Sequence, residues 1–370
     1  MSLKEIFCQD NAISILQRAY ASDKSPHAYI FAGAEGVGRF KTAREWARLL
    51  LCNSTVTEDG FSDSCGSCQS CRLLEAGSHP DFHHVYKELL EFTRDGKGRK
   101  PPLEFPIDVV REFVIEKVSN RPGVSRRKVF VLSEGEKLNN ESQNCLLKVL
   151  EEPPEYCTII LLCTRMERLL PTTKSRCQII RFLPIAEERI IGKLNQMGLD
   201  GKKAQYFARL AQGSLGQACQ WAQLELADAE LYQTKKELLS SVAGLEYAGA
   251  LELAGWLMDE SKKIAAVWAE LDKNTSKKDI NRRAAKTLVQ VIISALHDTM
   301  TLNLSGSQNL INFDQKEQIK KLAQHLGPEE AAEKIADAYQ TMRWIESAVN
   351  ERLIFEQLLL NLAVSDKIKI

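Results

Sequence analysis

Residues 27–43 read HAYIFAGAEGVGRFKTA, and their pattern indicates the fold class most directly. The apolar, aromatic run at 27–33 predicts a strand, the glycines after it predict a tight loop, and the residues from 39 onward carry a helical pattern. In a strand, loop and helix of this kind, backbone N–H groups and the positive end of the helix can cradle a phosphate group. The stretch is therefore a candidate phosphate loop, with glycines Gly33, Gly36 and Gly38.

The same alternation of strands and helices continues outward from this stretch as far as residue 182. Further short apolar runs predict strands at 81–87, 127–134, 157–164 and 178–182, with helical patterns between them. Strands that alternate with helices form a mostly parallel sheet that is covered on both faces. The sequence therefore predicts one α/β domain over residues 1–182, which is an ordinary domain size.

Helical patterns alone follow after residue 182. Three short ones lie at 186–197, 202–211 and 215–225, and the amphipathic helices become longer after about residue 240. We expect a small helical domain at 183–238 and a larger helical domain at 239–370. The apolar faces of the long helices either close a core of their own or pack against neighbouring subunits, and periodicity does not choose between these.

Composition and charge restrict the class of protein. The 370 residues include 49 basic and 49 acidic side chains, so the bulk charge attracts neither nucleic acid nor an anionic membrane. The first residues lack the pattern of a signal peptide, and no apolar run is long enough to cross a bilayer. We expect a cytoplasmic protein with no membrane partner, whose ten cysteines are thiols or metal ligands and not disulfides.

Four cysteines form the pattern C-x12-C-x2-C-x2-C in an insertion at about 52–78, before the strand at 81. Thiolates at this spacing can turn onto one ion and complete a tetrahedral S4 shell, which is typical of structural zinc. An iron–sulfur cluster and free thiols are the alternatives. Because four protein ligands leave no position for substrate, we expect a zinc ion that stabilises the insertion. Its ligands would be Cys52, Cys65, Cys68 and Cys71.

The candidate phosphate loop departs from the nucleotide-hydrolase pattern G-x4-G-K-[ST]. Arg39 stands in the place of the lysine, and Phe40 in the place of the hydroxyl that binds Mg²⁺. The strand at 127–134 ends in Ser133 and Glu134, where a metal-binding aspartate and a catalytic glutamate are typical. Because two metal positions are lost, we expect no hydrolysis of ATP by this chain. Binding of ATP by the three glycines and Arg39 is in doubt.

Several segments in the same order resemble a known family. They are SPHAYIFAGAEGVGR (25–39), CGSCQSC (65–71), LNNESQNCLLKVLEEPP (138–154) and SRC (175–177). Over its first 220 residues the chain resembles the delta-prime family of the bacterial DNA polymerase III clamp loader, of the AAA+ class, and its gamma/tau relatives. The tail is similar more weakly, through residues 349–362. The resemblance implies an AAA+ sheet domain with a zinc insertion, a small helical lid domain and a helical collar that oligomerises.

The departures from the hydrolase pattern resemble the non-hydrolysing delta-prime subunit and not the gamma type. Gamma-type subunits keep the lysine, the hydroxyl and the acidic pair, and they carry a sensing arginine at the position of Gly216. In the family, the arginine of the S-R-C motif enters the ATP site of a neighbouring subunit. The resemblance therefore implies that Arg176, between Ser175 and Cys177, is an arginine finger that acts in trans.

The resemblance also implies partners. The chain would be a stator that assembles with gamma/tau ATPase subunits and a delta subunit, within the polymerase III holoenzyme, so that the complex loads the sliding clamp on primed DNA. One alternative is a divergent gamma-type ATPase that uses Arg39 and Glu134. The other is a purely structural interaction subunit in which Arg176 is idle. Whether the chain is itself an enzyme stays open between these alternatives.

Overall fold

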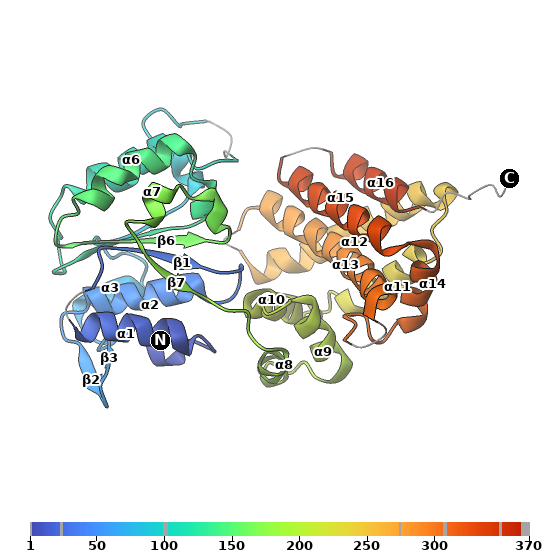
Figure 1. Cartoon of the computed structure of the whole chain (residues 1–370), viewed down its shortest axis with the longest axis horizontal. Helices are drawn as coiled ribbons and strands as arrows, with labels where there is room; N and C mark the ends of the chain where they lie inside the picture. Colours follow the sequence, from blue (N-terminus) through green and yellow to red (C-terminus); the bar gives the residue numbers. More distant parts are fainter. Residues whose placement is uncertain are drawn as a thin grey trace. The chain divides into compact units, whose positions relative to one another are not determined.

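The computed structural model describes residues 2–22, 25–98, 103–273, 275–305, 309–347 and 350–363. The chain divides into two compact units, residues 1–185 and 186–370. Among the described residues the first unit is an α/β domain and the second contains helices without strands (Figure 1). The predicted fold class, a parallel α/β domain followed by helical structure, is therefore confirmed.

Five parallel strands form the sheet of the first unit, in the order β4-β5-β6-β1-β7. Every residue of the three inner strands is buried, because a parallel sheet is covered on both faces. Each strand overlaps one of the runs predicted from the sequence. The strands are β1 (Ala28–Ala32), β4 (Phe82–Val85), β5 (Lys128–Leu132), β6 (Cys157–Cys163) and β7 (Gln178–Arg181).

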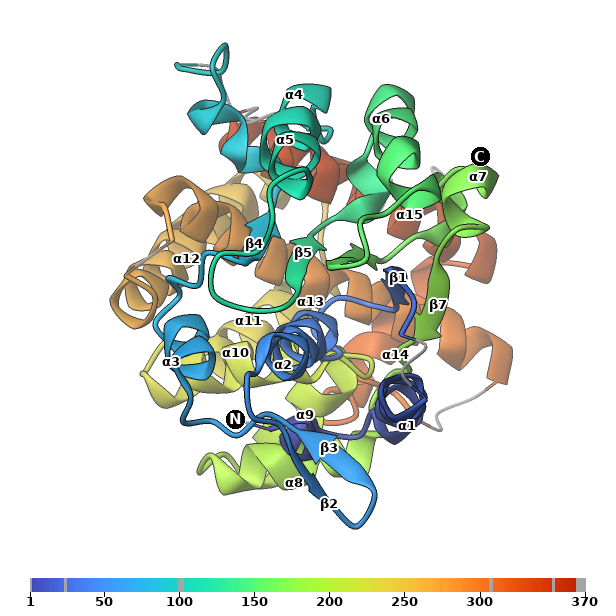
Figure 2. The same ribbon diagram turned by 90° about the vertical axis from the view of Figure 1, so that its left-hand side faces the viewer.

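Helices cover the two faces of this sheet and enclose two cores (Figure 2). Successive side chains of a strand point to opposite faces, so Tyr29 and Phe31 pack with Trp46 of α2, while Ile30 packs with Leu146 of α6. The first face carries α1 (Asp10–Ala21) and α2 (Arg39–Leu51). The second carries α6 (Asn140–Glu151), and also α4 (Ile107–Val110) and α5 (Glu116–Val118), which a π-helical turn (Arg111–Ile115) joins.

The cysteine insertion has structure that the sequence patterns did not predict. It consists of the antiparallel hairpin β2 (Val56–Glu58) and β3 (Phe61–Asp63), followed by α3 (Gln69–Glu75). The side-chain amide of Gln17 on α1 donates to the carbonyl of Ser62 and accepts from its N–H, both at 2.8 Å. These two bonds attach the hairpin to α1.

The segment just before β4 attaches the insertion to the sheet. Asp81, just before β4, accepts hydrogen bonds from three successive backbone N–H groups, those of Gly123, Val124 and Ser125, at 2.7–2.9 Å. His79 contacts the hydroxyl of Ser70 on α3 at 2.7 Å. The segment HPDF (79–82) therefore links α3, the strand β4 and the loop before β5.

Short helical turns complete the first unit. The 3-10 turns span Leu3–Glu5, Lys87–Phe92, Gly135–Lys137 and Met166–Arg168, and the four-residue helix α7 spans Pro171–Lys174.

The second unit contains nine helices in its described part. The first three agree with the predicted short helices, and the predicted boundary at residue 238 lies inside α11, so the division into lid and collar stays a prediction. No described helix has the length and apolar character needed to cross a membrane. The helices are α8 (Glu187–Gln196), α9 (Gly201–Leu210), α10 (Leu215–Leu226), α11 (Leu231–Val242), α12 (Tyr247–Leu271), α13 (Lys277–Ser305), α14 (Lys316–His325), α15 (Pro328–Glu346) and α16 (Glu351–Leu362).

A buried polar cluster joins α9, α11 and the residues before α14 in this second unit. Nζ of Lys235 is 2.5 Å from Oδ1 of Asp314, and the Tyr232 hydroxyl donates to the same carboxylate at 2.7 Å. Nζ of Lys235 also lies 4.5 Å from the centre of the Tyr206 ring. The Lys235 side chain has no exposed surface, so its charge depends on these partners.

Candidate functional site

The glycine loop leads from β1 into α2, as predicted. A Cβ atom on Gly33 would lie 2.6 Å from the carbonyl oxygen of Phe182, so only glycine fits between the two strands here. Gly36 and Gly38 have φ angles of 77° and 102°, and Gly38 directly precedes the first helical residue, Arg39. The loop therefore has the strand–loop–helix geometry in which backbone N–H groups can bind a phosphate group.

The positive charge of Arg39 already has acidic neighbours. Nε of Arg39 donates to the carbonyl of Ala34 at 3.2 Å. Burial lowers the pKa of Arg39, and the negative charges of Glu136 and Glu35 oppose that shift. Glu136 itself accepts from the N–H and the hydroxyl of Thr164, at 3.0 and 2.6 Å. Although burial alone would raise its pKa, these bonds and the charge of Arg39 hold the pKa of Glu136 below its usual value.

The two positions expected to have lost Mg²⁺ ligands lie against the same histidine. The ring of Phe40 is 4.7 Å from the ring of His84, measured between centres, and Nε2 of His84 is 2.8 Å from the hydroxyl oxygen of Ser133. Burial lowers the pKa of His84 to about 4, so the ring is neutral at neutral pH. Phe40, His84 and Ser133 therefore form a cluster without charge.

The remaining acidic candidate, Glu134, is engaged in ion pairs. It has a left-handed backbone conformation (φ 54°) directly after β5. One carboxylate oxygen lies 3.3 Å from Nζ of Lys87, and the other pairs with Nζ of Lys137. Both oxygens of the Glu134 carboxylate therefore already have a cationic partner.

Arg176 lies at the end of the segment 168–176, whose backbone and side chains make several hydrogen bonds. Its Nη2 atom is 2.6 Å from Oε1 of Glu151, and its Nη1 atom donates to the carbonyl of Thr172 at 3.0 Å. The Arg176 side chain is 34% exposed, so the guanidinium is within reach of another molecule. Burial raises the pKa of the neighbouring Cys177 thiol to about 12, so this side chain is an inert core group. The Ser175 hydroxyl donates to the carbonyl of Thr172 at 3.1 Å and accepts from Nη1 of Arg176 at 3.5 Å.

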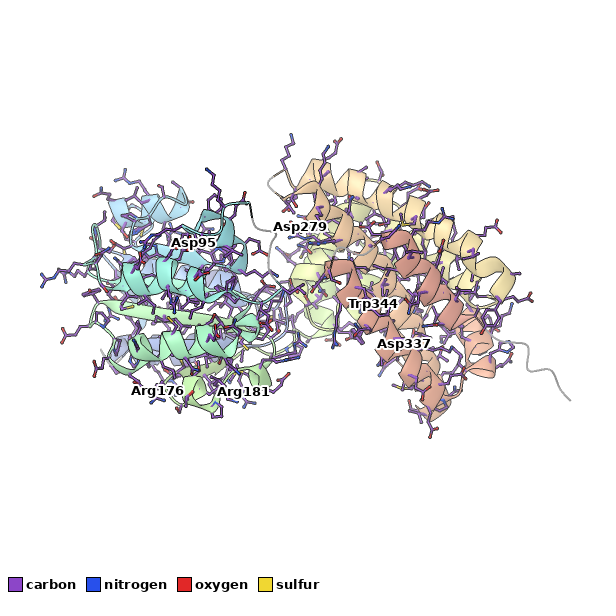
Figure 3. The ribbon with its side chains drawn as sticks, turned by 90° about the horizontal axis from the view of Figure 1, so that it is seen from above. Asp95, Arg176, Arg181, Asp279, Asp337 and Trp344 are labelled. Carbon is purple, nitrogen blue, oxygen red and sulfur yellow. The ribbon has the colours of Figure 1, made fainter. Side chains whose placement is uncertain are left out.

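Sequence reasoning missed three side chains of this region. Gln143 and Glu151 of α6 contact the segment that carries Arg176. The sequence pattern did not single them out, because the apolar residues of this amphipathic helix were used to predict it and its polar residues were not considered as contacts. Arg181 on the edge strand β7 is exposed, and its side chain makes no ion pair or hydrogen bond within the described residues. Arg176 and Arg181 lie on the same side of the first unit (Figure 3).

The four predicted cysteine ligands converge, and Cys71 alone among them is fully buried. Their sulfur atoms all lie within 4.8 Å of one another, and those of Cys52 and Cys65 are 3.5 Å apart. Zinc–thiolate bonds of about 2.3 Å in a tetrahedron require sulfur atoms about 3.8 Å apart, so the four ligands fit such an ion. These cysteines come from the end of α2, the loop after β3 and the start of α3.

Backbone donors around the cluster favour thiolates. The N–H groups of Cys65, Cys68 and Cys71 point at the sulfur atoms of Cys52, Cys65 and Cys68 respectively, at 3.3–3.5 Å. Burial alone would raise the pKa of Cys65, but such donors lower it to about 6. Burial raises the pKa of Cys52 to about 12 and also raises that of Cys71, so an ion that binds here has to displace the protons of these two thiols. The four residues are therefore a group that can hold a metal ion.

Two family models match the chain. The model described as "DNA polymerase III, delta subunit" matches residues 8–186, and the model described as "DNA polymerase III, delta subunit, C terminal" matches residues 270–363. Together they cover well over half of the 370 residues. The match thus includes both the sheet domain and the long helices.

Curated relatives agree with these models. DNA polymerase III subunit delta' of Escherichia coli (strain K12) is 26% identical over 94% of this chain and 92% of its own length. The delta' subunit of Bacillus subtilis (strain 168) is 29% identical over 55% of this chain and 56% of its own length, so this chain spans about half of that relative. DNA polymerase III subunit tau of Escherichia coli (strain K12) is 26% identical over 81% of this chain and 44% of its own length. The chain belongs to the delta-prime family of DNA polymerase III subunits.

Proposed function

We propose that this chain is a clamp-loader subunit that does not hydrolyse ATP and that supplies Arg176 to the ATP site of a neighbouring gamma/tau-type subunit. The observation that carries the proposal is the pair of metal positions: Phe40 and Ser133 both lie against a neutral His84. A nucleotide hydrolase needs Mg²⁺ to bridge the phosphates and neutralise developing charge. A cluster without charge does not hold that ion.

Glu134, the candidate catalytic base, also supports the conclusion that this chain does not hydrolyse ATP. In a hydrolase this glutamate would orient or deprotonate the attacking water, which requires an available carboxylate. Here Lys87 and Lys137 pair with both oxygens. The glycine loop and Arg39 keep a backbone able to accept phosphate, so bound nucleotide without turnover is compatible with this function.

Arg176 has the chemistry that the proposed role needs. A planar guanidinium offers several donors to phosphate oxygens and keeps its charge at any physiological pH. Arginine fingers raise the rate of nucleotide hydrolysis by about 10³- to 10⁵-fold in other hydrolases. The partial exposure of Arg176, on the last turn before an edge strand, supports an action on a second molecule.

The partners of this function follow from family membership and from the relatives' names, and they are part of the proposal. The chain would assemble with gamma/tau and delta subunits, and the assembly would place the sliding clamp on primed DNA. The helical unit would supply the oligomeric contact. Zinc bound by Cys52, Cys65, Cys68 and Cys71 would stabilise the insertion between α2 and β4 and take no part in catalysis.

Two measurements test the function. The purified chain alone is expected to show no ATP turnover at saturating Mg-ATP, with or without primed DNA, above an Arg39→Ala control. In the assembled complex, Arg176→Ala is expected to lower ATP turnover by at least a hundredfold while assembly stays intact. Arg181→Ala is the matched control, because it removes an exposed arginine from the same side of the unit.

The alternatives give different results in these measurements. Turnover by the isolated chain that Arg39→Ala abolishes would identify a divergent ATPase. Unchanged turnover in the Arg176→Ala complex would identify a purely structural subunit and overturn the proposed role of Arg176.

A further inference from the structure

The segment that carries Arg176 is held by one buried amide, that of Gln143 on α6. Gln143 is 1% exposed. Its Nε2 atom donates to the carbonyl of Leu138 at 3.0 Å and to the carbonyl of Arg168 at 3.2 Å. Its Oε1 atom accepts from the N–H of Leu170 at 2.8 Å and from the hydroxyl of Thr173 at 3.3 Å. Three of these four bonds therefore reach residues 168–173.

The pattern of these bonds leaves the amide one orientation. Both donor bonds end on carbonyl oxygens and one acceptor bond begins at a backbone N–H, so exchange of oxygen and nitrogen would break these three bonds, whereas the Thr173 hydroxyl could reverse its own. A buried polar group with every bond made is rigid and specifies one local conformation. Gln143 thus fixes the backbone of the segment on which it acts.

That backbone leads directly to Arg176. The N–H of Arg176 donates to the carbonyl of Thr173 at 3.3 Å, and the Thr173 side chain is fully buried. Helix α7, which contains Thr173, has only four residues, and one helical turn is not stable by itself. The position of the Arg176 backbone therefore depends on groups outside this helix, and Gln143 contacts the helix and the residue before it, through Thr173 and Leu170.

Helix α6 contacts both the backbone before Arg176 and the Arg176 guanidinium. Gln143 near its N-terminus bonds the backbone before Arg176, and Glu151 at its C-terminus pairs with the guanidinium. The helix itself is well defined, since the side chain of Asn139 caps its first turn by accepting from the N–H of Ser142 at 2.8 Å. A rigid helix with two attachments can set the position of the finger to within a fraction of an ångström.

We propose that Gln143 is a positioning residue for Arg176, which orients the finger segment for hydrolysis in the neighbouring subunit. This inference rests on the proposed function. A catalytic group misplaced by about 1 Å costs on the order of a hundredfold in rate. Because the finger acts on charge that develops in the transition state, the loss falls on kcat of the partner and leaves KM for ATP nearly unchanged.

The test is a double-mutant cycle in the assembled clamp-loader complex. Gln143→Met keeps the length of the side chain and removes all four bonds. It is expected to lower kcat for ATP by at least tenfold in the complex, with KM within twofold of the unchanged chain. In the Arg176→Ala background the same substitution is expected to have no further effect, because the residue acts through the arginine.

Controls separate positioning from general loss of stability. Gln17→Met removes an amide with comparable bonds on α1, at the other face of the sheet, and is expected to leave ATP turnover unchanged. If the Gln143→Met chain does not assemble, Thr173→Val takes its place in the cycle, since it removes a single hydroxyl from the same network and is expected to lower kcat about threefold or more.

Each other outcome overturns a specific statement. A normal kcat in the Gln143→Met complex, or in the Thr173→Val complex where that variant replaces it, overturns the inference. An equal loss with and without Arg176 also overturns it, because Gln143 would then act by another route. If Arg176→Ala itself has no effect, the proposed function fails, whereas a large Arg176→Ala effect beside a normal Gln143→Met rate rejects the inference alone.

Discussion

Nη2 of Arg176 lies 2.6 Å from Oε1 of Glu151, the last residue of α6. The two side chains are 34% and 48% exposed. An ion pair with this exposure contributes on the order of 1 kcal/mol or less. The guanidinium is therefore held by a partner that another anion can replace at small cost.

Under the proposed function, Glu151→Gln is expected to raise kcat for ATP in the assembled complex, by at most about fivefold, because the guanidinium no longer leaves a carboxylate when it meets the charge that develops in the transition state. KM for ATP is expected to stay the same. Glu152→Gln is the matched control, since Glu152 is adjacent and exposed and makes no ion pair within the described residues. A fall in kcat would mean that Glu151 is needed in the active arrangement.

Cys71→Ser is expected to remove zinc from the insertion. The purified chain should hold one zinc ion, because four thiol groups converge there, and the variant should hold none. Metal content by mass spectrometry measures the ion, and calorimetry should show a lower melting temperature for the α/β unit. Cys145→Ser on α6 is the control and should keep the zinc. Full zinc in the Cys71→Ser variant would contradict the ligand assignment.

His83→Phe is expected to make stability less sensitive to acid. Burial, with the charges of Lys117 and Lys128, lowers the pKa of His83 to about 4, and its ring stacks on Phe130. Below pH 6.5 His83 binds a proton in the unfolded chain but stays neutral in the folded chain. The free energy of unfolding therefore falls between about pH 6.5 and 4, by at most about 3 kcal/mol.

Urea unfolding at pH 7 and pH 4.5 measures this difference for both chains. Phenylalanine fills the same stacked position and does not titrate, so the variant should lose less stability between the two pH values. Equal losses would mean that His83 is charged in the folded state.

Lys235→Met is expected to destabilise the helical unit by about 3–5 kcal/mol, because it leaves the buried carboxylate of Asp314 without its cation. Adding Asp314→Leu should recover part of that loss. Lys236→Met, next in the chain and only partly buried, should cost less than about 1 kcal/mol. Urea unfolding of the three variants provides the comparison. A small effect of Lys235→Met alone would show that water reaches this pair.

Patterns that depend on near neighbours in the chain were predictable. The apolar runs of β1, β5 and β6 mark inner strands because a strand buried on both faces needs apolar side chains throughout. The spacing of Cys65, Cys68 and Cys71 marks a metal site because two intervening residues allow one turn of chain around an ion. The hairpin β2–β3 was not predictable, since its three-residue strands are too short for periodicity to show.

Local patterns along the chain are enough to predict the order of strands and helices, the cysteine cluster, and the presence of Arg39 and Phe40 directly after the glycine loop. The partners that surround these residues come from the folding of distant segments onto one another. This folding placed His84 between Phe40 and Ser133, two lysines beside Glu134, and Gln143 under the Arg176 segment. Such partners are distant in the chain and meet because the parallel sheet brings the ends of its strands to one edge, a relation that local spacing does not record.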